Sequence, residues 1–191
     1  MFINFVALML INLATALALV AYYVYAGLDD PDQKRWAPGF AMSGLVALVT
    51  GFFMIFNWPL PGSYNMAFGE ASVLFGIVLL GAAAALALSW QLLTVTVYAF
   101  FAGLAAIVYG ARMINLAMTK EPLLAGLGYI LAGLGGVLSG PALALRKNRT
   151  LRLAAALVLL AAALAWAATG YPAIWGHLAQ YSKWVPPLMR Q

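Results

Sequence analysis

The stretch FINFVALMLINLATALALVAYYVYA at residues 2–26 decides the fold class, because none of its side chains is charged. A helix needs about 20 apolar residues to cross a hydrocarbon core of about 30 Å. The next residues, GLDDPDQKR at 27–35, bring charges and a proline that end such a helix. Residues 2–26 also lack the basic leading region of a signal peptide, so we predict that they form a membrane span.

The composition of the whole chain agrees with this prediction. Of its 191 residues, 65% are hydrophobic and only 8% are charged, whereas a typical soluble domain is about 25% charged. These values exclude a soluble globular domain, a disordered chain and a nucleic-acid-binding module. The chain has no cysteine, which excludes disulfides and thiolate metal sites, and its one histidine, His177, excludes a haem held by two histidines of this chain.

Further apolar stretches follow the first, separated by short segments that carry charges, prolines or glycines. We therefore predict an all-α polytopic membrane protein, a bundle of six transmembrane helices in one domain over residues 1–191. Residues 170–191, which are rich in aromatic side chains and proline, are expected to lie at the membrane interface. The predicted spans cover residues 2–26, 38–56, 71–88, 92–118, 122–145 and 151–169.

The basic residues predict the orientation of the bundle. With six spans, the loops after the first and fifth spans share one side, and both are rich in Lys and Arg. The positive-inside rule places that side in the cytoplasm. Both termini, the loop at 58–70 and the tail with His177 are then predicted to lie outside. The basic residues that set this orientation are Lys34, Arg35, Arg146, Lys147, Arg149 and Arg152.

The two halves of the chain resemble each other when one is shifted by 84 residues. Tyr25 then meets Tyr109, and a proline follows each tyrosine at the same spacing, as Pro38 and Pro122. Three spans per half would give an inverted 3+3 repeat, a common transporter design. Alternatively, helices rich in alanine, glycine and leucine match by chance.

The fifth predicted span is rich in small residues at a spacing of four. Gly128, Ala132, Gly136 and Gly140 would lie along one face of a helix and let another helix approach closely. This candidate packing interface either joins the protein to a partner or a second copy, or packs the helix at the centre of its own bundle.

A candidate functional cluster lies at the predicted outer face. Glu70 either binds a cation or relays a proton, or it only stabilises the first turn of the third span. Arg112 needs a partner if the fourth span reaches residue 118, and Glu70 is the natural one; if the span ends earlier, Arg112 extends to the interface. The full candidate cluster contains Glu70, Arg112, Asn115, His177, Tyr64 and Asn65.

The same face offers only a poor metal site. His177, Glu70 and Met66 supply one imidazole, one carboxylate and one thioether, which is a weak ligand set without a partner chain. The predicted spans contain no paired carboxylates, and no nucleotide-binding motif is present. We therefore predict no catalytic residues, no cofactor and no bound metal.

The loop motif WPLPGSYNMAFGE at residues 58–70, followed by LFG at 74–76, resembles the signature of a prokaryotic membrane family, number 981 among the domains of unknown function. The resemblance covers nearly the whole chain and implies a place in the cytoplasmic membrane of a prokaryote. It implies no activity, but it marks the loop as the segment of interest through Pro59, Pro61, Gly62, Tyr64, Asn65, Gly69 and Glu70.

Three functions remain open at this point. The first is a non-enzymatic structural or accessory subunit, in contact with the lipid bilayer and with further copies of itself or other membrane subunits. The second is a small channel or transporter built on the inverted repeat. The third is a metal or redox site on the outer face.

Overall fold

The computed structural model describes residues 5–185, and all regular structure in that part of the chain is helical. The first half contains α1 (Val6–Tyr22) with a π-helical turn η1 (Tyr23–Gly27), a short 3-10 turn η2 (Gln33–Trp36) with α2 (Ala37–Asn57), and a second π-helical turn η3 (Asn65–Glu70) with α3 (Ala71–Ala87). The second half contains α4 (Leu93–Asn115), α5 (Pro122–Val137), α6 (Ser139–Ala144) and α7 (Arg149–Gln180).

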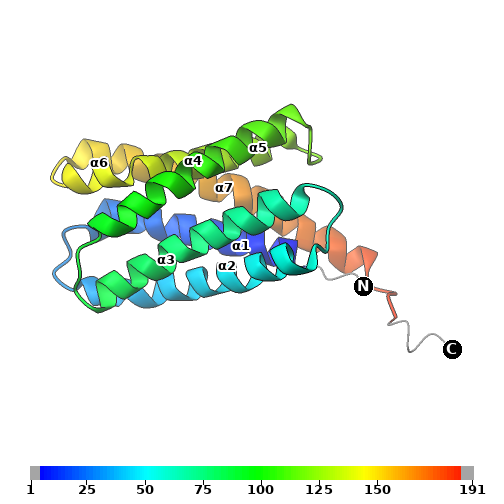
Figure 1. Cartoon of the computed structure of the whole chain (residues 1–191), viewed down its shortest axis with the longest axis horizontal. Coiled ribbons are helices and arrows are strands. Elements are labelled where there is room, and N and C mark those ends of the chain that lie inside the picture. Colours follow the sequence, from blue (N-terminus) through cyan, green and yellow to red (C-terminus); the bar gives the residue numbers. More distant parts are fainter. Residues whose placement is uncertain (1–4, 186–191) are drawn as a thin grey trace.

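The long helices run up and down in sequence order, so that alternate loops meet at the same end (Figure 1). The loops at 28–32, 88–92 and 145–148 lie at one end, which we call the basic end. The loops at 58–64 and 116–121 lie at the other, which we call the Glu70 end, together with the start of α1 and the end of α7. The predicted grouping of the two basic loops, and of the 58–70 loop with the tail, is therefore observed.

Five helical segments in the described part are long and apolar enough to cross a membrane, and α5 is a shorter apolar helix. The sequence predicts one span over residues 122–145, but the helix breaks after Val137 and resumes as α6. Pro141 explains the break, because it lacks the N–H that would bond the carbonyl of residue 137 and its ring crowds that carbonyl.

Two other boundaries differ from the prediction. The fourth helix ends at Asn115 rather than residue 118, and Ala117 beyond it adopts a positive φ of 47°. The last helix begins at Arg149, where the Asn148 side chain caps the Leu151 N–H at 3.1 Å, and it continues past residue 169 to Gln180. A single proline, Pro172, stands in this extension.

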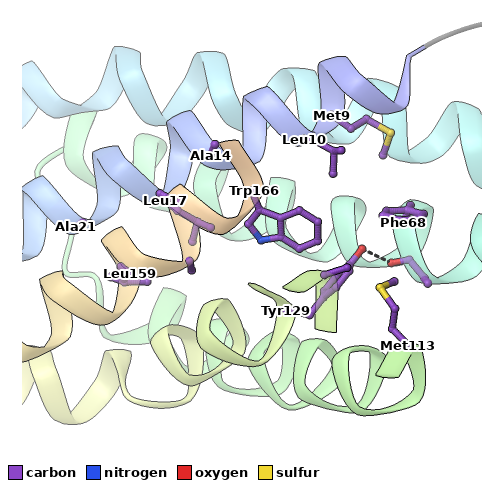
Figure 2. Close-up of a cluster of buried hydrophobic side chains, with 14 of the residues drawn as sticks. Met9, Leu10, Ala14, Leu17, Ala21, Phe68, Met113, Tyr129, Leu159 and Trp166 are labelled. Carbon is purple, nitrogen blue, oxygen red and sulfur yellow. Dashed lines mark hydrogen bonds between the residues drawn. The ribbon is translucent and has the colours of Figure 1, made fainter. Parts of the chain in front are cut away.

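The main buried cluster lies in the half of the bundle nearer to the Glu70 end. Figure 2 shows the Trp166 indole between α1 and the ring of Tyr129, with Phe68 and Met113 beyond it. The rings of Tyr129 and Trp166 meet edge to face, with centroids 4.9 Å apart. Only 1% of Trp166 is exposed. A second buried cluster, around Tyr23, Trp36, Phe40 and Leu79, lies toward the basic end.

Glycines set the closest helix contacts. A Cβ at Gly110 of α4 would lie 2.6 Å from the Gly126 carbonyl oxygen of α5, and one at Gly44 of α2 would lie 3.0 Å from the Gly76 carbonyl of α3. Side chains larger than hydrogen would separate these backbones. The two tightest pairs therefore join α4 to α5 and α2 to α3.

The residues of the candidate packing interface are divided between α5 (Gly128, Ala132 and Gly136) and α6 (Gly140), and all of them face other helices of this chain. A Cβ at Gly136 would lie 2.6 Å from the Ala99 carbonyl of α4, and one at Gly128 would lie 2.9 Å from the Trp166 indole. Ala132 packs against the main buried cluster, and Gly140 faces the Thr96 side chain at 3.5 Å. The contacts of this glycine-rich helix thus belong to its own bundle.

The inverted repeat stays a prediction. The segments that begin at Asn65 and Arg149 are offset by 84 residues, as the repeat requires. The repeat also pairs the α2–α3 contact with the contact between α5 and α7. There, however, Gly128 and Gly135 of α5 face side chains of Trp166 and Leu159 rather than a glycine backbone.

Candidate functional site

The 58–65 loop is organised around the side chain of Asn65, which is fully buried. Its Oδ1 accepts a hydrogen bond from the Leu60 N–H at 2.9 Å, and its Nδ2 donates to the carbonyls of Leu60 and Gly62. Gly62 has a φ of +55°, which glycine adopts without steric cost. Asn65 therefore supplies the polar partners that a tight, proline-containing loop cannot find in regular structure.

Glu70 ends the π-helical turn that follows this loop, and its partner is not the one expected. Its Oε2 accepts a hydrogen bond from the hydroxyl of Tyr109 on α4. Of the two alternatives for Arg112, the structure shows the second, because α4 ends early and Arg112 Nη1 donates to Asn115 Oδ1 at 2.7 Å in the exposed last turn of that helix. Because α4 ends at Asn115, the Arg112 guanidinium lies at the exposed Glu70 end of the bundle and does not need a buried acid as its partner.

Two further tyrosines bond to the backbone near Glu70. The Tyr64 hydroxyl donates to the Met118 carbonyl, which lies in the loop after α4. The Tyr129 hydroxyl of α5 donates to the Ala67 carbonyl at 2.8 Å, drawn as a dashed line in Figure 2. A π-helical turn interrupts the regular backbone ladder, and the Tyr129 hydroxyl bonds a carbonyl within it. Together with the Tyr109 bond, these contacts join the 58–70 segment to the second half of the chain.

His177 lies apart from this network, on the extension of α7. Its ring packs against that of Tyr181 with centroids 6.0 Å apart. Trp175 next to it is 82% exposed, so the 58–70 loop does not cover this part of the tail. Within residues 5–185, no three His, Cys, Asp or Glu side chains are arranged to hold a metal ion.

The basic end contains a buried arginine whose role the sequence did not indicate. Arg152 is only 7% exposed. Its guanidinium donates to the carbonyls of Val24 at 2.9 Å and Tyr25 at 2.6 Å, and it forms an ion pair with Asp29. The carbonyls belong to the π-helical turn that ends the first helix, where unpaired acceptors are expected. In the sequence, Arg152 is only one of several basic residues that predict the orientation of the bundle.

Asp30 organises the loop beside it. Its carboxylate accepts hydrogen bonds from the Asp32 N–H and the Trp36 indole, both at 3.0 Å, and pairs with Arg35. Partial desolvation opposes ionisation, but these two hydrogen bonds and the Arg35 charge outweigh it and lower the pKa of Asp30 below its ordinary value. Asp30 is therefore ionised at neutral pH and fixes the turn into α2.

Two adjoining hollows open the interior from the basic end. The outer one, the vestibule, has a volume of about 910 Å³ and is bounded by the 28–34 loop, residues 89–93 and Arg146. The inner one, the chamber, has a volume of about 320 Å³ and is lined by residues of every long helix. The residues that line both are Tyr23, Leu28, Leu86, Leu92 and Leu143.

Comparison with known proteins gives a family but no activity. The sequence model of a family described as "Protein of unknown function (DUF981)" matches residues 1–180. No curated protein and no solved structure matches the chain. The match includes the 58–70 loop, both hollows and the whole of α7.

Proposed function

This chain belongs to the DUF981 family, and we propose that it is a six-span membrane protein that serves as a structural or accessory subunit rather than as an enzyme. One observation carries the proposal. The polar groups of the 58–70 segment bond within the chain, through Asn65, Tyr64 and the Tyr109–Glu70 contact. Such bonds join the two halves of the chain, and a rigid bundle suits a protein that presents a fixed surface to a partner.

In this proposal α5 and α6 together form the fifth of the six spans. At a rise of about 1.5 Å per residue, the 16 residues of α5 extend about 24 Å, and α6 adds the remaining depth toward the basic end. The positive-inside rule places the basic end in the cytoplasm and the Glu70 end outside. The membrane is then the cytoplasmic membrane of a prokaryote.

The surface offered to a partner is the outer face of α4. This helix exposes Val97, Tyr98, Phe101 and Leu104, and aromatic side chains are enriched at protein interfaces. In this proposal the face contacts a second copy or another membrane subunit as well as lipid.

Native purification in mild detergent, followed by mass spectrometry of the intact particle, tests the proposal. We expect a complex larger than one chain. The Phe101→Ala variant should weaken it, whereas Leu157→Ala, on the exposed face of α7, should not. Recovery of the unmodified protein only as a lone monomer would contradict the accessory role.

A small channel or transporter is the second candidate, and the vestibule and chamber favour it because they lead from the basic end into the bundle. The Tyr129–Trp166 ring pair and Phe68 occupy the bundle beyond the chamber, so transport would require this aromatic layer to move. Ion conductance of reconstituted vesicles above that of protein-free vesicles would favour this candidate over the first.

A further inference from the structure

The chamber has the chemistry of a hydrocarbon site. Among its lining residues only Tyr23, Thr96 and Ser139 carry polar side-chain atoms. Each of these hydroxyls already donates a hydrogen bond, to the Gln33 side chain, the Leu93 carbonyl and the Gly136 carbonyl respectively. Water therefore finds no free donor in the chamber, and cavities of this kind stay dry or take an apolar ligand.

The size of the chamber fits one short chain. Its volume of about 320 Å³ lies at the lower end of the range for small-molecule sites, about 300–1,000 Å³. If each methylene group is given about the 30 Å³ that a water molecule occupies in the liquid, the chamber holds roughly ten such groups. One hydrocarbon chain of about ten carbons would therefore fill this volume.

The vestibule offers a place for a negatively charged head group. Of the acids that line it, Asp29 and Asp30 are engaged by Arg152 and Arg35. The side chains of Lys34 and Arg146 also line it, and within residues 5–185 neither forms an ion pair, so the two cations outnumber the one remaining acid, Asp32.

The start of α4 adds to this preference for an anion. Leu92 and Leu93 line the vestibule at the first turn of α4, and no side chain caps the amides there. Free amides at a helix start favour negative charge. The two cations and the start of α4 therefore both favour an anion in the vestibule.

We propose that the chamber and vestibule form one binding site for a single-chain amphiphile with an anionic head group. The hydrocarbon chain lies in the chamber, and the head group lies in the vestibule beside Lys34 and Arg146. The hydrocarbon chain enters from the basic end. It extends no further than the chamber, because the aromatic layer of Tyr129, Trp166 and Phe68 lies between the chamber and the Glu70 end. This site does not depend on the accessory role proposed above.

Binding of decanoate to the purified full chain in nanodiscs tests the site. We expect saturable binding that falls at least tenfold in Ala82→Phe of α3 and in Ala155→Phe of α7, which fill the chamber from two walls. The matched controls are Ala84→Phe and Ala161→Phe, which place the same ring on exposed positions of the same helices. Absence of saturable decanoate binding to the unmodified protein would overturn the proposal.

The head group is tested with decanol and decylammonium, which share the chain but differ in charge. We expect the order decanoate, decanol, decylammonium from tightest to weakest. The double variant Lys34→Gln and Arg146→Gln should weaken decanoate binding severalfold and leave decanol binding unchanged, with Arg149→Gln as the control outside the vestibule. Tightest binding of decylammonium would refute the anionic head group.

Photolabelling of the unmodified protein tests the site even if Ala82→Phe and Ala155→Phe do not fold. A decanoate analogue with a diazirine on the chain should label Val78, Ala82 and Val158 of the unmodified protein, which line the chamber. Labelling confined to lipid-facing residues such as Leu157 and Leu160 would overturn the proposal.

Discussion

Single side chains at the two ends of the bundle satisfy backbone groups that the helices leave unpaired. At the basic end Arg152 bonds the carbonyls of Val24 and Tyr25, and at the other end Tyr129 bonds the carbonyl of Ala67. Both acceptors lie in π-helical turns, where regular hydrogen bonding is interrupted. In a membrane such acceptors are costly when unpaired, so both side chains are expected to stabilise the fold.

Replacement of Arg152 should destabilise the protein more than replacement of any neighbouring basic residue. Arg152→Gln removes the ion pair with Asp29 and leaves the carbonyls of Val24 and Tyr25 without a charged donor. We expect a loss of about 2–4 kcal/mol in the free energy of unfolding, seen as a lower melting temperature in detergent. Arg149→Gln, an exposed change in the same turn, is the control. Equal melting temperatures for the two variants would contradict this account.

Replacement of Tyr129 by phenylalanine removes only the hydroxyl that bonds Ala67. The ring contact with Trp166 remains, so the expected loss is about 1–2 kcal/mol. Tyr171→Phe, at an exposed position of α7, should have no effect. Denaturant titration in detergent measures both, and an unchanged midpoint for Tyr129→Phe would argue against a stabilising bond.

The stability contributed by Asp30 should depend on pH. Because its pKa is lowered in the folded protein, the ionised carboxylate stabilises the fold. That contribution is complete at pH values above its ordinary pKa of 3.8, and it is lost as the pH falls through the lowered value. The melting temperature of Asp30→Asn should therefore lie below that of the unmodified protein at about pH 7 and approach it in acid. A difference that does not change with pH would contradict the assignment.

At the scale of the helices, the apolar runs predicted most elements because a span needs a long uncharged stretch. The break between α5 and α6 was missed, although Pro141 was visible, since a proline can either kink or end a helix. The Glu70 partner was also missed. Tyr109 and Arg112 lie about one turn apart on α4, and only the observed end of that helix shows which of them faces the acid.

The contacts of α4 with α5 and α6 give a matched pair of glycine substitutions. Gly136→Ala would place a Cβ 2.6 Å from the Ala99 carbonyl, which is backbone and cannot move alone. We expect a loss of about 1–3 kcal/mol. Gly140→Ala, whose Cβ would lie 3.5 Å from the Thr96 hydroxyl, makes an ordinary contact and should be nearly neutral. Thermal unfolding in detergent compares them, and equal stability of the two variants would mean that α4 and α5 are not packed this closely.

At the scale of the whole molecule, the loops gather at two ends of the helical bundle, and we propose that the basic end faces the cytoplasm. The spacing of the apolar runs along the sequence was enough to group the loops correctly (Figure 1). The buried contacts of Arg152 and the chamber were not predictable, because both depend on residues far apart in the chain: Arg152 lies 128 residues from Val24. The chamber in turn needs contributions from every long helix.

Single cysteines test the six-span topology most directly, since the natural chain has none. Ser63→Cys, Lys147→Cys and Ser182→Cys each place one thiol at an exposed position. In intact cells, a membrane-impermeant maleimide should label Ser63→Cys and Ser182→Cys, and it should label Lys147→Cys only after the cells are opened. Labelling of residues 63 and 182 from opposite sides of the membrane would contradict the account, because an odd number of spans would then separate them.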